Sequence, residues 1–267
     1  MATQVHLAQA AGQGSSLGEA VDRWFFVGMA LFLVTVILVG FVPDSFLRIE
    51  DIAAGGRGGF LWQAHFHALT MASWMALLLA QTLLMATGRG GWHGQLGVLG
   101  MVLAPLLVIA GVMLVPANFA ARVAFAQGAG ESPAEIAQMM RAMTNTAAMQ
   151  LRSGFCFAVL VGLGFAARGR DAGLHKRLII LATIAPIGAA FARMPFLWNS
   201  GPASPLSTLL WPTLCLVPML AWDLARGRGV HRAYWIYLAV MVPTGTAVML
   251  AWNNPAWQAF ARPLLGG

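Results

Sequence analysis

Residues 96–115 read LGVLGMVLAPLLVIAGVMLV, a run without a single charged side chain. The hydrocarbon core of a bilayer is about 30 Å thick, and an α-helix rises about 1.5 Å per residue. Roughly 20 apolar residues are therefore enough to cross it. This stretch predicts a transmembrane helix.

The rest of the 267-residue chain repeats this pattern. It is 59% hydrophobic and 9% charged, whereas soluble domains carry about 25% charged residues. We therefore expect an all-α integral membrane protein with about seven transmembrane helices. The six further predicted spans are residues 24–42, 60–86, 149–167, 178–194, 206–222 and 234–252.

Three parts of the chain follow from these spans. Residues 1–23 form a cytoplasmic tail that lacks the basic region and cleavage site of a signal peptide. Residues 24–252 form a single membrane domain, and residues 253–267 form an outer C-terminal tail. Within the domain we expect one leading helix followed by three hairpins.

The long connection between the third and fourth spans contains a helix signal. Ser132 and Glu135 have the spacing of a capping box, with Pro133 at the first helical position. Methionines then recur on one face. We expect a short amphipathic helix at about 132–144, which either lies on the outer surface or covers the end of the bundle.

Small residues and prolines mark the later spans. Gly154, Ala158, Gly162 and Ala166 recur at every fourth position, which predicts a central, tightly packed fourth helix. Prolines predict interruptions in the fifth and sixth spans. These prolines are Pro186, Pro212 and Pro218.

The orientation follows from the basic residues. Nine lysines and arginines fall on one side and seven on the other, and eight of the nine lie in three tight turns. Short loops rich in positive charge face the cytoplasm. Acidic residues dilute the opposite side. We therefore expect a bacterial inner-membrane protein with a cytoplasmic N-terminus and a periplasmic C-terminus, whose basic pI reflects contact with the lipid bilayer and not with nucleic acid.

The three tight turns resemble one another, because each runs from a Gly/Arg pair to one histidine at the start of the next span. These histidines are His93, His175 and His231. One interpretation is a cytoplasmic ring of histidines that binds a cofactor or relays protons. The alternative is that arginine and histidine at a helix end lie at the level of the headgroups.

Polar side chains also gather at the outer ends of several spans. On a helix the side chains of His65 and His67 point about 200° apart, so the two cannot coordinate the same ion. We expect His67 to face the bundle and His65 to face headgroups or another helix. The expected outer pocket comprises His67 with Trp74, Gln81, Arg152, Arg193 and Asn199. The alternative is an interhelical hydrogen-bond network.

Two cofactors suit these residues. Haem b needs axial ligands on facing helices. On the outer side His65 or His67 would supply one, with Met149, Met194 or Met249 as the partner, and on the inner side a pair from His93, His175 and His231 would supply both. Copper suits imidazole and thioether ligands, here His65, His67 and Met149. Methionine is also an ordinary filler of apolar helices.

Several motifs resemble known proteins. Phe66-His67-Ala68-Leu69 with Trp74 and Gln81, the turn ending at His93, and Leu174-His175-Lys176-Arg177-Leu178 resemble a group of uncharacterised bacterial integral membrane proteins over most of residues 60–260. The His-Lys-Arg-Leu segment is also similar to small cytochrome c oxidase assembly membrane proteins. The usual first turn reads His-Arg-Arg-Leu-Gly, whereas this chain has His-Gly-Gln-Leu-Gly, which weakens any need for a basic residue there. The resemblance implies a respiratory-membrane or cofactor context and no catalytic residue.

Three functions remain open. The first is a haem- or metal-binding protein of electron transfer or oxidase maturation, with respiratory-chain components or quinone as partners. The second is a transporter for an anion or small solute, and the third is an enzyme acting on lipid or quinone. No predicted span contains lysine, aspartate or glutamate, which excludes a retinal Schiff base and weighs against a carboxylate relay.

Overall fold

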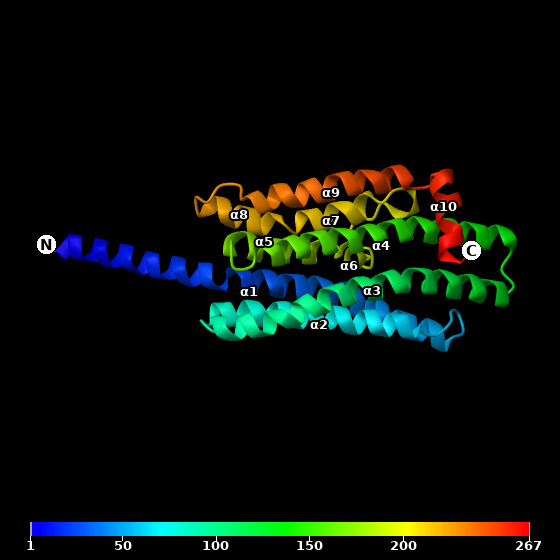
Figure 1. Cartoon of the computed structure of the whole chain (residues 1–267), viewed down its shortest axis with the longest axis horizontal. Helices are drawn as coiled ribbons and strands as arrows, with labels where there is room; N and C mark the ends of the chain where they lie inside the picture. Colours follow the sequence, from blue (N-terminus) through cyan, green and yellow to red (C-terminus); the bar gives the residue numbers. More distant parts are fainter. Residues whose placement is uncertain (1, 267) are drawn as a thin grey trace.

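In the computed structural model, the backbone is described for residues 2–266 and the side chains for residues 18–266. The chain forms a bundle of α-helices (Figure 1). The helices are α1 (Ala2–Ala53), α2 (Trp62–Ala86), α3 (Gly90–Gly128), α4 (Pro133–Ala167), α5 (Ala172–Ile184), α6 (Gly188–Phe191), α7 (Leu206–Leu214), α8 (Val217–Ala225), α9 (Arg232–Ala251) and α10 (Pro255–Leu265).

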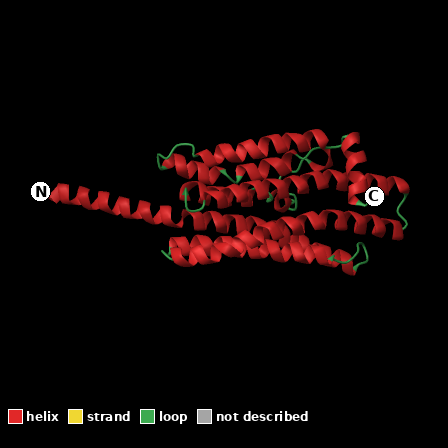
Figure 2. Cartoon of the chain, viewed as in Figure 1, coloured by secondary structure: helices red, strands yellow, loops and turns green. Residues whose placement is uncertain are grey.

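The predicted architecture is confirmed. The described residues contain helices and turns and no strand (Figure 2). Among them, seven helical segments are long and apolar enough to cross a membrane, with α5–α6 and α7–α8 each counting as one. The segments alternate in direction, so the three Arg/Gly/His turns lie together at one end of the bundle (Figure 1). We call this the turn end and the opposite one the loop end.

Two helices run beyond their predicted ends. α1 continues through Pro43 to Ala53, and α3 continues through Pro116 to Gly128. The predicted ends of these spans, at residues 42 and 115, were therefore wrong. A proline removes one backbone hydrogen bond, and a long membrane helix tolerates that loss. α1 ends only where Gly55 adopts a positive φ of 77°.

The predicted capping box is confirmed, but the separate amphipathic helix is wrong. The Ser132 hydroxyl accepts from the Glu135 amide, while the Ser132 amide donates to the Glu135 carboxylate at 2.8 Å. The helix that starts here is α4, which continues to Ala167 without a break. Met140 and Met143 pack against α3 and α10 around Phe119, so the methionine stripe fills an apolar interface.

The predicted interruptions occur in the fifth and sixth spans. α5 ends at Ile184 just before Pro186, and α8 starts anew with Pro218 in its first turn. Pro212 lies inside α7 and does not break it. Both spans are therefore pairs of short helices.

The fifth span, and not the fourth, is the most buried. The small-residue prediction for α4 is also wrong, because added β-carbons at Gly154 and Gly162 would meet no atom within 4 Å. The close approaches involve other glycines. A β-carbon at Gly40 would lie 2.5 Å from the carbonyl oxygen of Ala190, and one at Gly188 would lie 2.7 Å from that of Thr208. α6 therefore packs closely against both α1 and α7.

Both predicted tails differ from expectation. The C-terminal tail is largely helical, since α10 folds back onto α3 and α4 and Trp257 donates to the carbonyl of Thr144 at 3.0 Å. For the N-terminal tail, the side chains of residues 1–17 lie outside the described part. Residues 18–23 continue α1.

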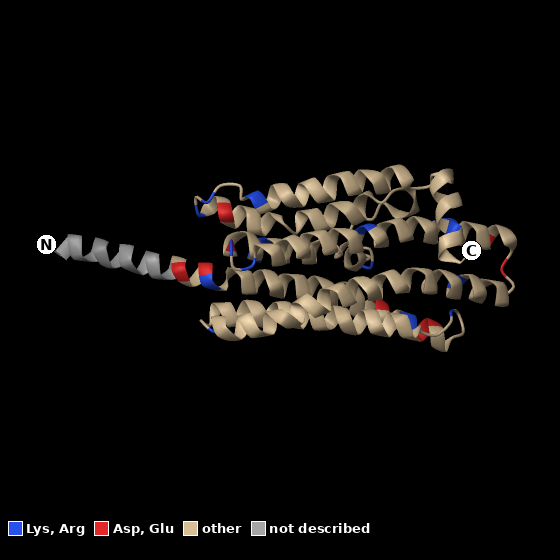
Figure 3. Ribbon diagram, viewed as in Figure 1, with Lys and Arg blue, Asp and Glu red and all other residues tan. Residues whose placement is uncertain are grey.

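Most charged residues lie toward the two ends of the bundle (Figure 3). Acidic residues are found at the turn end as well, where Asp22, Asp171 and Asp223 pair with arginines. Acidic residues therefore offset the positive charge at both ends of the bundle, and not at the loop end alone.

Candidate functional site

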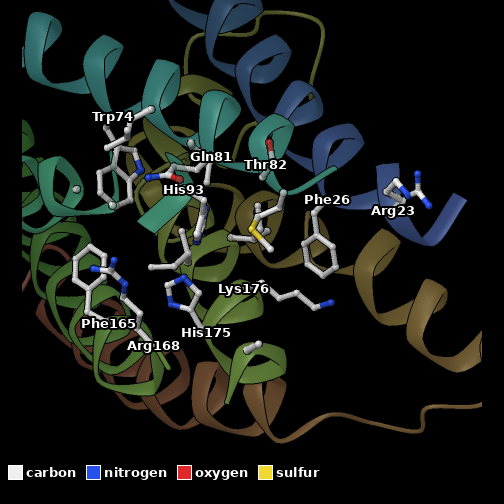
Figure 4. Close-up of a pocket in the computed structure, with 18 of the residues that line it drawn as sticks. Arg23, Phe26, Trp74, Gln81, Thr82, His93, Phe165, Arg168, His175 and Lys176 are labelled. Carbon is white, nitrogen blue, oxygen red and sulfur yellow. The ribbon is translucent and has the colours of Figure 1, made fainter. Parts of the chain in front are cut away.

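A cavity of about 380 Å³ lies at the turn end. Its lining comes from α1, α2, α3 and α5 and from the end of α4 (Figure 4). The apolar part of the wall consists of Phe26, Trp74, Leu77, Leu78, Met85, Phe165, Ile179 and Ile180. Polar side chains line it as well, from α1, α2, α3 and α5 and from the residue that follows α4.

Two of the three turn histidines meet in this cavity. The rings of His93 and His175 have centroids 6.3 Å apart and are nearly perpendicular, at 80° (Figure 4). The Nδ1 of His175 lies 2.8 Å from the carbonyl oxygen of Gly164. Because a carbonyl only accepts, this nitrogen carries the proton. The Nε2 of a neutral His175 is then a free acceptor.

Gln81 determines which ring nitrogen of His93 carries the proton. The amide satisfies its neighbours when its oxygen accepts from the Gly97 amide at 2.8 Å and its nitrogen donates to His93 Nδ1 at 2.6 Å. This orientation is assigned from the hydrogen-bond network. His93 then carries its proton on Nε2. The two imidazoles therefore present one donor and one acceptor.

Cationic residues line the same cavity. Arg23, Arg168 and Lys176 all contribute to its lining. The ammonium of Lys176 lies 4.5 Å from the ring centre of Phe26, and Arg168 donates to the carbonyl of Gly94 at 2.7 Å. Figure 4 shows Arg23, Phe26 and Lys176 on one side of the histidines and Trp74 on the other. The lining thus carries three cationic side chains and one carboxylate, Asp22, which pairs with Arg226.

The third turn histidine lies apart, so the predicted ring of three reduces to a pair. His231 caps α9, where its Nδ1 accepts from the Ala233 amide at 3.1 Å. Burial lowers the pKa of His231, and the positive charge of Arg177 lowers it further. Because the Nδ1 of His231 accepts a hydrogen bond, it carries no proton, and the ring is neutral in this arrangement.

Sequence reasoning missed a buried ion pair beside this cavity. Arg177 and Asp223 are 4% and 1% exposed and form a two-pronged pair, and Tyr234 donates to the same carboxylate at 2.6 Å. α5 begins at Ala172 and therefore also contains Lys176. The expectation that the spans hold no lysine or acidic residue was wrong, since both Asp223 and Lys176 lie within helices. A signal existed, because Asp223 is the sole acidic residue between Asp171 and the C-terminus.

A second cavity of about 300 Å³ lies toward the loop end. His67, Met149 and Arg193 line it. Arg193 donates to Asp44 at 3.1 Å. His65 does not line the cavity but packs, exposed, against Phe60.

The remaining members of the expected outer pocket are dispersed. Trp74 and Gln81 line the turn-end cavity, and the Trp74 indole donates to Thr183 at 3.1 Å. Asn199 accepts from the Gly201 amide and the Ser207 hydroxyl. Arg152 contacts α9 instead. The expectation of one outer pocket was therefore wrong.

The proposed copper ligands do not fit a metal centre. His65 is separated from the cavity that His67 and Met149 share. Within the described part of the chain, no group of three or more His, Cys, Asp or Glu side chains could hold a metal ion. We derive no chemistry from copper.

Comparison with known protein families, with curated proteins and with solved structures finds no match to this chain. Its function is therefore inferred from the chemistry of its own residues. The turn-end cavity offers the most developed arrangement of polar groups.

Proposed function

We propose that the turn-end cavity binds a ring compound of the quinone–hydroquinone class. The observation that carries this proposal is the complementary pair of imidazoles. A quinone carbonyl accepts a hydrogen bond from His93 Nε2, and a hydroquinone hydroxyl donates one to His175 Nε2. With ring centres 6.3 Å apart, the pair therefore suits one oxygen of the ring, which accepts from His93 as a carbonyl and also donates to His175 as a hydroxyl.

The walls and size of the cavity support the same class of ligand. Small-molecule sites are usually about 300–1,000 Å³, mostly apolar, with a few placed polar groups. At about 380 Å³ this cavity is at the small end of that range and suits one substituted ring. Phe26 and Phe165 supply flat apolar surface.

Neighbouring groups hold the two histidines in fixed tautomers. The carbonyl of Gly164 keeps the proton of His175 on Nδ1, and Gln81 keeps that of His93 on Nε2. A ligand thus meets preset hydrogen-bonding partners and does not need to reorganise them. Gln81 acts here as a positioning residue.

Haem b is the second candidate, favoured by the distance between the rings. His93 and His175 would hold the iron, because their ring centres are 6.3 Å apart and metal–imidazole bonds are about 2 Å long. This fit requires Gln81 in its other orientation, with its oxygen accepting from His93 Nδ1. Arg23 and Lys176 would then face the haem carboxylates. Haem supplies one-electron chemistry when bound.

The setting we propose is a bacterial inner membrane with the turn end in the cytoplasm. Arginine in short turns supports this orientation. Quinone and respiratory-chain components are partners available in such a membrane. Cysteine substitutions in the 88–93 turn and in the 54–61 loop, labelled from either side of the cell, test the orientation.

The ligand is tested on detergent-purified protein by an optical spectrum and by mass spectrometry of its organic extract. We expect co-purified quinone, reduced at least tenfold in His93→Ala and in His175→Ala. His65→Ala is the matched control, because this exposed histidine lies outside the cavity. A Soret band lost in the same two variants would instead assign the site to haem. Neither quinone nor haem in the wild-type protein would overturn both assignments.

A further inference from the structure

Arg152 occupies an unusual position for a charged residue. It lies on α4, is 7% exposed, and its Nη2 donates to the carbonyl oxygen of Met241 at 3.2 Å. Met241 is near the middle of α9, a helix that spans the bundle. The guanidinium is therefore level with the middle of a helix that is long and apolar enough to cross a membrane, and ionisable side chains within such spans usually mark a functional site.

The charge of Arg152 is not compensated by the protein. Arginine cannot be deprotonated in proteins and carries five N–H donors. No acidic side chain among residues 18–266 forms an ion pair with it. Its Nε is buried and has no hydrogen-bond partner. The equally buried Arg177, by contrast, is paired with Asp223.

A second donor without an acceptor lies on the facing helix. The hydroxyl of Tyr237 faces Thr213 of α7 but makes no hydrogen bond of good geometry. Tyr237 and Met241 are four residues apart and so share the face of α9 that Arg152 contacts. Tyr237 is fully buried.

Apolar side chains close this region on the loop-end side. Met149 and Val248 form a small core cluster there, and Leu209 of α7 packs against it. Leu209 and Arg152 both lie within 4 Å of a β-carbon placed on Gly245. The guanidinium of Arg152 and the unpartnered hydroxyl of Tyr237 are thus both buried where α4, α7 and α9 meet, and we call this place the niche.

We propose that this niche binds a small monovalent anion of the halide class, held by the Nε–H of Arg152 and the hydroxyl of Tyr237. One guanidinium balances one negative charge, whereas a divalent anion would leave excess charge in an apolar surrounding. A halide accepts from several donors without bringing any donor of its own. This site is independent of the turn-end cavity and of its ligand.

The test compares the melting temperature of purified protein in chloride and in gluconate at equal ionic strength, together with binding of radioactive chloride. The wild-type protein should bind chloride saturably and melt higher in chloride. Arg152→Met should lose both effects, and Tyr237→Phe should weaken chloride binding several-fold. Arg193→Gln is the control that should retain both, because Arg193 already pairs with Asp44.

The outcomes that overturn the proposal are equally definite. Wild-type protein that binds no chloride, with the same melting temperature in both salts, would show that the niche holds no halide. Chloride binding that persists in Arg152→Met would place the anion elsewhere. If Arg152→Met fails to fold, Arg152→Lys and Tyr237→Phe decide. Unchanged chloride affinity in both variants would also overturn it.

Discussion

Two polar cross-links join helices at opposite ends of the bundle. At the turn end, Arg177 of α5 pairs with Asp223 of α8, and Tyr234 of α9 donates to the same carboxylate. At the loop end, Asn145 of α4 bonds with Asn253 and accepts from Gln258 of α10. The first link is ionic and the second is neutral. The difference matters because a buried charge depends on its partner far more strongly than a buried amide does.

The largest expected effect comes from breaking the ionic link. Asp223→Asn leaves the guanidinium of Arg177 buried without a counter-charge, and we expect a loss of about 3–5 kcal/mol in the free energy of unfolding. Thermal unfolding in detergent measures the change. Asp22→Asn is the control, since its pairs with Arg226 and Arg228 are part-exposed and worth about 1 kcal/mol or less.

A double variant distinguishes the contribution of the Arg177–Asp223 ion pair from the cost of an unpaired buried charge. If the damage in Asp223→Asn arises from the orphaned charge, then Arg177→Met combined with Asp223→Leu should regain much of the lost stability. A double variant less stable than Asp223→Asn would show that the pair contributes more than mutual neutralisation.

Loss of the neutral link should destabilise the protein less than loss of the ionic link. Asn145→Ala removes three hydrogen bonds and orphans groups on Asn253 and Gln258. We expect a loss of about 2–3 kcal/mol, because uncharged groups left unpaired cost about 1–3 kcal/mol each and Asn253 can turn to solvent. Thermal unfolding of Asn145→Ala beside Asp223→Asn tests the ranking. The reverse order would refute the comparison.

The close contact between α1 and α6 involves no polar side chain, and it extends the comparison to a third kind of link. Gly40→Ala places a methyl group 2.5 Å from the carbonyl oxygen of Ala190, so α1 and α6 must separate. Overpacking of this kind costs about 1–3 kcal/mol, and we expect the lower half of that range because α6 is short. Gly28→Ala on the same helix meets no atom within 4 Å and should unfold at the wild-type temperature or slightly above.

Sequence alone predicted the seven spans because each depends on a local quantity, the length of an apolar run. It failed at the helix ends because Pro43 and Pro116 read as loop signals in isolation. Within a long membrane helix, the remaining hydrogen bonds continue past a proline. Whether a helix continues depends on what it packs against, and composition does not record that.

The candidate site was harder to predict, and one error could have been avoided. His67 and Gln81 share a face of α2, which favoured one pocket. They are 14 residues apart (81 − 67), however, and this places them about 21 Å apart along the helix. A shared face therefore does not mean a shared site. The pairing of His93 with His175 depends on how α3 packs near α5, which no local pattern gives.

The smallest expected effect concerns Asp171, an ionic link at the exposed edge of the turn end. The backbone amide of Leu174 donates to this carboxylate at 2.8 Å, Arg232 pairs with it, and together they lower the pKa of Asp171. A carboxyl whose pKa is lower in the folded state stabilises the fold above its unfolded pKa of about 4. That stabilisation is lost as the pH falls through the folded pKa. Asp171→Asn retains the helix cap, because Asn caps as well as Asp, but it carries no charge. The wild-type protein should thus melt slightly above this variant at pH 7, and the difference should shrink below about pH 4 and vanish in stronger acid. A difference that stays constant with pH would assign the effect to the cap and not to the charge.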